Sequence, residues 1–299
     1  MSYKLFGFAS VEDCVSLEVS FLSRFMIMDK YAVIGNPIAH SMSPLIHRQF
    51  AEQTGQELSY EKILSPLEHF SETVQDFIRS GGMGCNVTLP FKEQAFQLAT
   101  RHSEDAELAG AVNTLSCEEE GIFGDNTDGE GLINDLKYHQ VPLTKARVLL
   151  IGAGGAARGV LLPLLRAGVD ALHIANRTPS KAQDLEKLVF KKGNVSASGL
   201  DNKWSQPFDI IINASSSGLS GERPDISSEI IGQETYVYDM VYGQQQTPFN
   251  QWAEQQGAVK VIDGLGMLVE QAALSFSIWR GVMPDTQSVR QALRNNLSA

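Results

Sequence analysis

The 299-residue sequence has few cysteines, no long apolar run and fewer basic than acidic residues. Its three cysteines, Cys14, Cys85 and Cys117, lack C-x-x-C spacing and a histidine at ligand spacing. They indicate reduced thiols of a cytoplasmic protein rather than a metal or redox site. No apolar run reaches the roughly 18 residues of a membrane span. The 24 Lys and Arg against 35 Asp and Glu give a formal net charge of −11, which argues against nucleic acid and anionic membranes as partners.

The chain is long enough for two domains and for a core that needs neither disulfide nor metal ion. From about residue 30 onward, short β-rich runs alternate with helical patterns, which is typical of an α/β fold. Residues 1–28 precede this pattern, and four charged residues interrupt their apolar stretch. Because they also lack a small-residue cleavage site, they do not resemble a secretory signal. We expect an extension of doubtful structure, either loose or the product of a misassigned start codon.

Three polar positions indicate where helices begin. Ser43 precedes Pro44, which suits an N-cap followed by proline at the first helical position. Residues 65–68 and 127–130 each place a Ser or Thr three residues before Glu. This spacing matches the capping box, in which the two side chains satisfy free backbone N–H groups. We therefore expect helices to start at these points.

A glycine-rich turn predicts a dinucleotide site. The strand-like run 148–151 leads directly into residues 152–157, which read Gly-Ala-Gly-Gly-Ala-Ala and open a helical pattern. Gly152 permits a tight turn, and Gly154 lets the backbone approach a pyrophosphate that rests on free amides at the helix N-terminus. A glycine-rich turn without a ligand is the alternative.

The end of the next strand favours NADP over NAD. An NAD site usually has Asp or Glu there, bound to the ribose. In this chain the strand 171–175 is followed by Asn176, Arg177 and Thr178, with no acidic residue. The Arg177 guanidinium would pair with a 2′-phosphate through charge-assisted hydrogen bonds. Alternatively, Arg177 only caps a solvated loop.

Lys92 and Asp128 are the candidate acid–base residues for hydride-transfer chemistry, which needs a group that exchanges the hydroxyl proton. Lys92 lies in the first turn of an expected helix, where the helix dipole favours the neutral amine. Asp128, at another helix entrance, would hold the lysine ammonium or serve as a cap. Small polar side chains that suit a hydroxylated substrate, or simply cap and turn positions, are Ser41, Ser43, Thr88 and Asn113.

Ordered motifs spread through the chain resemble those of the shikimate dehydrogenase family over essentially all of residues 29–299. The matching stretches are residues 35–44, 86–92, 109–114, 124–129, 152–157, 176–178, 238–240 and 263–268. Met42 stands where Leu or Lys is frequent in the family, and residues 1–28 have no counterpart there.

This resemblance implies reversible, NADPH-dependent reduction of 3-dehydroshikimate to shikimate in aromatic amino-acid biosynthesis, with Lys92 and Asp128 as the catalytic pair. The substrate residues that it implies are Ser41, Ser43, Thr88, Asn113, Asp128, Tyr242 and Gln271. The NADP residues that it implies are Gly152, Ala153, Gly154, Gly155, Ala156, Asn176, Arg177, Thr178, Met240 and Gly264. No metal ion is expected.

The resemblance also implies a discontinuous substrate domain with a mixed sheet, formed by residues 29–128 and 264–299. Residues 129–263 would form a Rossmann-like NADP domain, with the active-site cleft between the two. We expect a cytoplasmic monomer or homodimer. The alternatives are a quinate/shikimate dehydrogenase that uses both NAD and NADP, and a non-catalytic NADP-binding relative.

Overall fold

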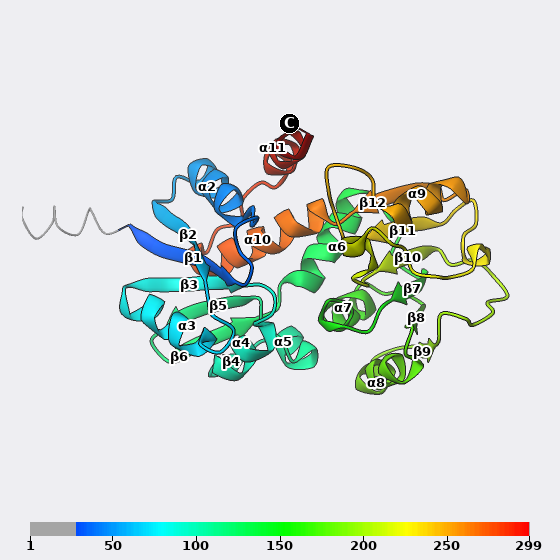
Figure 1. Ribbon diagram of the computed structural model, residues 1–299, viewed down its shortest axis with the longest axis horizontal. Helices are drawn as coiled ribbons and strands as arrows, with labels where there is room; N and C mark the ends of the chain where they lie inside the picture. Colours follow the sequence, from blue (N-terminus) through cyan, green and yellow to red (C-terminus); the bar gives the residue numbers. More distant parts are fainter. Residues whose placement is uncertain (1–27, 299) are drawn as a thin grey trace, which may run out of the picture.

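The computed structural model describes residues 28–298 and places two six-stranded sheets beside each other (Figure 1). The expectation for residues 1–28 lies, apart from Met28, outside the described residues. Among the described residues, no helix is long and apolar enough to cross a membrane. Cys85 and Cys117 are free thiols, and Cys14 lies outside the described part. The mixed α/β architecture predicted from the sequence is confirmed.

The first sheet is mixed, with the order β2-β1-β3-β5-β6-β4. Strands β1, β2 and β3 are parallel, whereas β5 is antiparallel to both β3 and β6. A hairpin turn at residues 118–121 joins β5 to β6. The strands are β1 (Asp29–Gly35), β2 (Leu58–Leu64), β3 (Gly82–Val87), β4 (Arg101–His102), β5 (Thr114–Glu118) and β6 (Gly121–Asp125).

Helices cover both faces of this sheet. On one face, α3 buries Phe70, Val74 and Phe77 in a cluster with Ile34 and Val87 of the strands, because residues at this spacing share one face of a helix. On the other, α2 packs against the C-terminal helices. The helices of this half are α2 (Ser43–Thr54), α3 (Phe70–Arg79), α4 (Lys92–Leu98) and α5 (Glu104–Ala109).

The second sheet is entirely parallel, with the order β12-β11-β10-β7-β8-β9. Its central strands are continuous apolar runs, as expected where helices cover both faces. Because the strand order reverses between β7 and β10, a crevice is expected at the carboxyl ends of these strands. The strands are β7 (Arg147–Ile151), β8 (Ala171–Ala175), β9 (Val195–Ser198), β10 (Ile210–Asn213), β11 (Tyr236–Asp239) and β12 (Lys260–Asp263). The helices are α7 (Gly155–Arg166), α8 (Pro179–Val189), α9 (Pro248–Gln255), and the 3₁₀ turns η1 (Ser217–Ser220) and η2 (Ser228–Ile230).

Two helices run between the sheets: α6 (Asp128–Tyr138) leaves the first, and α10 (Leu265–Arg280) returns to it after β12 (Figure 1). They pack against each other, and α10 also contacts α2, β3 and β5. The last helix, α11 (Gln287–Ser298), covers α2 and α10. Buried Asp135 of α6 accepts a hydrogen bond from Tyr238 of β11 and pairs with Arg290 of α11.

The predicted helix caps are wrong in detail, and at Ser65 and Thr127 the reason is that residues further along the chain bind the hydroxyl groups. Helix α2 begins at Ser43 itself, after Met42, and no side chain caps it. Ser65 does not start α3, which begins at Phe70. The Ser65 hydroxyl lies 3.0 Å from Thr73 Oγ1 instead. Thr127 does occupy the N-cap position of α6, but its hydroxyl donates to the Gln271 carbonyl at 3.0 Å instead of capping the helix.

Candidate active site

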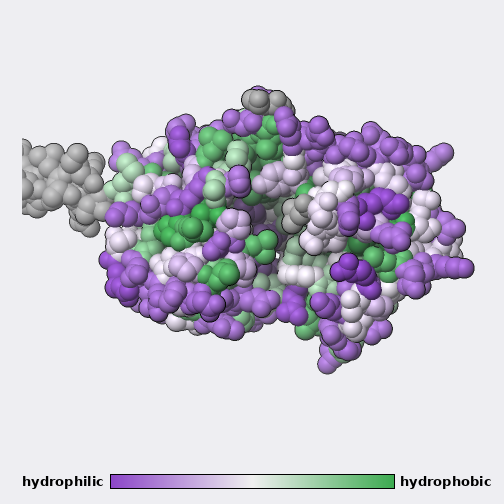
Figure 2. Space-filling model, viewed as in Figure 1, coloured by the Kyte–Doolittle hydropathy of each residue, from purple (hydrophilic) through white to green (hydrophobic). Residues whose placement is uncertain are grey.

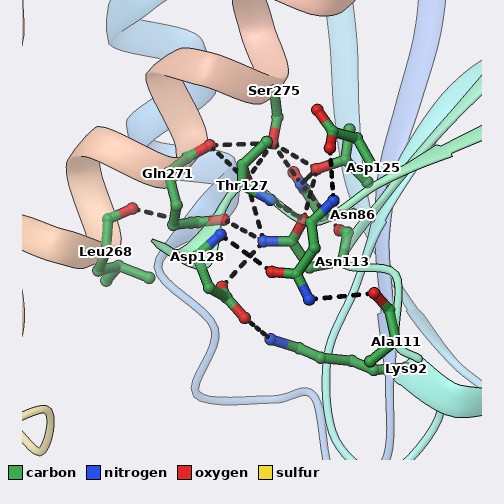
Figure 3. Close-up of polar contacts among 12 residues, drawn as sticks. Asn86, Lys92, Ala111, Asn113, Asp125, Thr127, Asp128, Leu268, Gln271 and Ser275 are labelled. Carbon is green, nitrogen blue, oxygen red and sulfur yellow. Dashed lines mark hydrogen bonds and ion pairs between the residues drawn. The ribbon is translucent and has the colours of Figure 1, made fainter. Parts of the chain in front are cut away.

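Lys92 and Asp128 lie in contact in the structure (Figure 3). Each is the first residue of its helix, α4 and α6 respectively. The Lys92 Nζ atom is 2.5 Å from Asp128 Oδ2, and the two side chains are 29% and 16% exposed. Partial burial strengthens such a pair relative to one on the surface. The ammonium is therefore held in one place while a substrate still has access to it.

Asn113 and Gln271 join this pair from two further elements. Asn113, in the loop before β5, donates from Nδ2 to Asp128 Oδ1 at 2.9 Å and lies 3.2 Å from Gln271 Oε1. Gln271 is on the second turn of α10 and donates to the Leu268 carbonyl. Four of the predicted site residues, from separate regions of the sequence, thus converge on one point (Figure 3).

The other predicted substrate residues, Ser41, Ser43, Thr88 and Tyr242, lie on other elements. Ser41 Oγ donates to Ser43 Oγ at 3.2 Å at the start of α2. Thr88 follows β3 and is half-buried. Tyr242 follows β11 and packs on the cluster that includes Met42; burial raises the pKa of its hydroxyl, and Asp263 adds to this effect. Within residues 28–298, no direct hydrogen bond joins these four side chains to Lys92 or Asp128.

The glycine-rich turn exposes main-chain amides where β7 meets α7. Gly152 has φ +118°, and a Cβ there would lie 3.0 Å from the Ala214 backbone, so only glycine suits the turn. Gly154 and Gly155 are exposed, and a Cβ on either would meet nothing within 4 Å. Open space in front of a helix N-terminus fits a pyrophosphate.

The three residues after β8 form a turn at the surface. Asn176 Nδ2 donates to the Thr178 carbonyl at 3.0 Å, which holds the turn in shape. Arg177 is exposed and makes no hydrogen bond or ion pair with any other residue in the described range. An exposed guanidinium of this kind suits a phosphate monoester, which it can bind through charge-assisted hydrogen bonds.

Met240 and Gly264 meet at the carboxyl ends of β11 and β12. A Cβ on Gly264 would lie 2.1 Å from the Met240 carbonyl oxygen, so the two backbones are in close contact and no side chain fits between them. Figure 2 shows the surface hollowed between the two halves of the molecule. In the described range, no group of three or more His, Cys, Asp or Glu residues is placed to hold a metal ion.

Family models cover most of the chain. The shikimate dehydrogenase substrate binding domain matches residues 33–115, shikimate / quinate 5-dehydrogenase matches residues 135–221, and the shikimate 5′-dehydrogenase C-terminal domain matches residues 264–294. Shikimate dehydrogenase (NADP(+)) of Photobacterium profundum is 54% identical over 271 residues, which cover 90% of this chain and 99% of that protein. The chain belongs to the shikimate dehydrogenase family.

Solved structures related to this family share the whole fold. Shikimate 5-dehydrogenase from Thermus thermophilus, in complex with NADP(H) and shikimate, superposes with a TM-score of 0.81 at 36% identity, covering 90% of this chain and all of that one. The 5-ketofructose reductase of Gluconobacter sp. strain CHM43 gives 0.82 at 30% identity, covering 91% and 99%. The fold therefore carries more than one named activity, and the side chains of the site must identify the substrate.

Some residues of this shikimate dehydrogenase family site were missed in the sequence. Asn126 Oδ1 accepts the backbone N–H of Asp128 at 3.2 Å, and Thr127 N donates to Asn113 Oδ1 at 2.9 Å. Both are buried; the sequence pattern gave Thr127 a role only as a helix cap and gave Asn126 none. The signal was available, because a helix start needs one capping side chain and this one has three consecutive polar residues, Asn126, Thr127 and Asp128.

Proposed function

We propose that the protein catalyses the reversible, NADP-dependent reduction of 3-dehydroshikimate to shikimate in aromatic amino-acid biosynthesis. The observation that carries the proposal is the half-buried Lys92–Asp128 pair, held against Asn113 and Gln271. The sequence identity to NADP-dependent shikimate dehydrogenases supports the same activity.

The predicted substrate residues suit opposite ends of this substrate. The paired hydroxyls of Ser41 and Ser43 would bind its carboxylate. Thr88, Asn113 and Gln271 would bind ring hydroxyls, and Tyr242 would border the carboxylate from the second half of the molecule. All are neutral groups that orient a substrate by directional hydrogen bonds.

Lys92 would act as the general acid for reduction and as the general base for oxidation. Its Nζ atom gives a proton to the carbonyl oxygen of 3-dehydroshikimate as negative charge develops there, and it takes the hydroxyl proton of shikimate in the reverse direction. Asp128 holds the ammonium in place by the 2.5 Å contact. When bound, NADPH supplies the hydride.

The cofactor would lie along the exposed backbone of the second half. The amides of residues 152–156 would hold the pyrophosphate, and Asn176, Arg177 and Thr178 would hold the adenine-side ribose and its phosphate. Met240 and Gly264 would border the nicotinamide. Arg177 favours NADP over NAD, because its guanidinium makes no other interaction among the described residues and a 2′-phosphate would give it a partner.

The domain division at residues 128/129 and 263/264 is part of this proposal. The packing of α10 and α11 on α2 supports it, and closure of the two halves would bring hydride donor and substrate together. A cytoplasmic location and a monomeric or homodimeric state stay predictions.

The test is the absorbance change of NADP+ reduction by the purified protein, first with shikimate and then with quinate, each repeated with NAD+. We expect the highest kcat/KM for shikimate with NADP+. A higher value for quinate or for NAD+ would favour the dual-specificity alternative. Reduction of 5-ketofructose by NADPH, without turnover of shikimate, would assign the chain to the activity of the Gluconobacter neighbour, and no turnover at all would favour the non-catalytic relative.

A further inference from the structure

A line of hydrogen bonds through the interior leads to the catalytic pair. It starts at Tyr60 of β2. Burial raises the pKa of Tyr60 well above its usual value, so its hydroxyl stays protonated and acts as a donor. It donates to Asn86 Oδ1 at 2.7 Å. Asn86 is buried on β3, two residues before Thr88.

His47 fixes the orientation of the Asn86 carboxamide. Burial lowers the pKa of His47 to about 3, so the ring is neutral, and it stacks on Tyr60 with ring centroids 4.2 Å apart. Its Nε2 atom lies 3.2 Å from Asn86 Oδ1, and must be the donor because that oxygen only accepts. With two donors on Oδ1, the amide nitrogen faces the other way and donates to Thr114 Oγ1 and Ser275 Oγ, at 3.2 and 2.9 Å.

The second half of the line repeats this arrangement at Asn113. Thr114 Oγ1 donates to Asn113 Oδ1 at 2.9 Å, and the backbone N–H of Thr127 donates to the same oxygen. The amide nitrogen of Asn113 therefore points to Asp128 Oδ1, at 2.9 Å. Every donor from Tyr60 to Asp128 thus faces the same direction. Lys92 approaches the carboxylate of Asp128 from its other oxygen (Figure 3).

We propose that Tyr60 and Thr114 are positioning residues in an internal relay, formed by Tyr60, Asn86, Thr114, Asn113 and Asp128. The relay carries orientation, and no proton needs to move along it. It fixes which atoms Asn113 and Asp128 present to the substrate, so the ring hydroxyls meet donors and acceptors whose directions are set in advance. The inference rests on the proposed function, since it assigns the ring hydroxyls of the substrate to Asn113.

The test uses isosteric variants. Tyr60→Phe removes only the hydroxyl and keeps the stack on His47. We expect the KM for shikimate to rise about tenfold, with kcat and the KM for NADP+ within about twofold, because a lost hydrogen bond to a buried partner weakens binding by this order. Tyr31→Phe is the matched control: Tyr31 pairs with Tyr60 in register on β1, and its hydroxyl contacts Arg280, outside the relay. It should leave all three constants unchanged.

Thr114→Val should act at the other end. Without the Thr114 hydroxyl, the Asn113 carboxamide loses a donor, and we expect kcat to fall about tenfold. Thr114→Ser retains the hydroxyl and should restore kcat, which a purely steric role of the methyl group does not predict. Thermal melting of each variant shows whether it is folded before its kinetics are read.

The double variant Tyr60→Phe/Thr114→Val decides whether the two ends are linked. In a relay, the second substitution acts on a hydrogen-bond network that the first has already disrupted. The combined loss in kcat/KM should therefore be clearly smaller than the product of the two single losses. A loss equal to that product, or a Tyr60→Phe variant with wild-type kinetics, would overturn the relay while leaving the activity intact. A folded wild-type protein that does not turn over shikimate would instead contradict the proposed function.

Discussion

The two sides of the site are built from different parts of the chain. On the substrate side, side chains from α4, α6, α10 and the loop before β5 interlock through hydrogen bonds around Asp128. On the cofactor side, the expected contacts are exposed main-chain amides at the start of α7 and the exposed guanidinium of Arg177. One side is fixed by its own bonds, whereas the other presents groups that few internal partners restrain.

This difference follows from what each side has to recognise. A ring with several hydroxyl groups is distinguished from similar rings only by donors and acceptors in fixed directions, so the side chains must be oriented in advance. Phosphates carry charge that a helix N-terminus and a flexible arginine attract from many directions. In a chain with net charge −11, these local features have to bind anions against the overall field.

The largest effect is expected from Lys92→Ala, which removes the acid–base group from the substrate side. We expect kcat to fall by roughly 10²–10⁴-fold, with shikimate affinity only mildly changed, because Ser41, Ser43 and Asn113 remain. Steady-state NADP+ reduction gives kcat, and calorimetric titration gives the shikimate Kd.

Lys203→Ala is the control, since Lys203 is an exposed lysine far along the second half and should retain wild-type kcat. Unaltered turnover of the Lys92→Ala variant would refute the assigned role.

Asp128→Asn should also show a large loss of kcat. Wild-type kinetics of this variant would show that Asp128 serves only to start α6.

Arg177→Gln tests the cofactor side. Loss of a charge-assisted hydrogen bond to a 2′-phosphate should lower kcat/KM for NADP+ by about 10–100-fold, while kcat/KM for NAD+ stays the same because NAD+ lacks that phosphate. Comparing the two cofactors with saturating shikimate measures this directly. Arg48→Gln, at another exposed arginine, is the control, and an equal loss with both cofactors would contradict phosphate recognition by Arg177.

Low pH should lower the stability of the folded protein through His47. Its pKa is about 3 in the folded protein and near 6.5 in the unfolded chain. Above pH 6.5 the ring is neutral in both states, so its titration does not change the free energy of unfolding. Below pH 6.5 the unfolded chain binds a proton that the folded protein excludes, and stability falls, by about 2 kcal/mol at pH 5.

Urea unfolding of wild type and His47→Gln at pH 7 and pH 5 measures this contribution. The variant should lose about 2 kcal/mol less than wild type between the two pH values, whatever its stability at pH 7. Equal losses would show that His47 is not kept neutral in the folded protein.

The sequence predicted what depends on local spacing. The Lys92 and Asp128 positions and the glycine turn could be read from short motifs, because a helix start or a tight turn restricts the residues that form it. The caps at Ser65 and Thr127 were wrong, since Thr73 and Gln271 compete for their hydroxyls. Asn86 and Ser275, 189 positions apart, meet only after α10 returns to the first sheet, and no periodicity encodes that contact.

Two glycines of one turn sharpen the contrast between structure and ligand binding within the cofactor side. Gly154→Ala places a methyl group in open space, where nothing lies within 4 Å, so the melting temperature should stay the same. The KM for NADP+ should rise about tenfold, because the methyl group occupies the space of the pyrophosphate.

Gly152→Ala should instead lower the stability of the fold. At φ +118°, with the Ala214 backbone 3.0 Å away, it should cost roughly 1–3 kcal/mol of stability. If Gly154→Ala bound NADP+ as wild type does, the amides at the start of α7 would not be the pyrophosphate site, and the cofactor side would need side-chain contacts of the kind that the substrate side has.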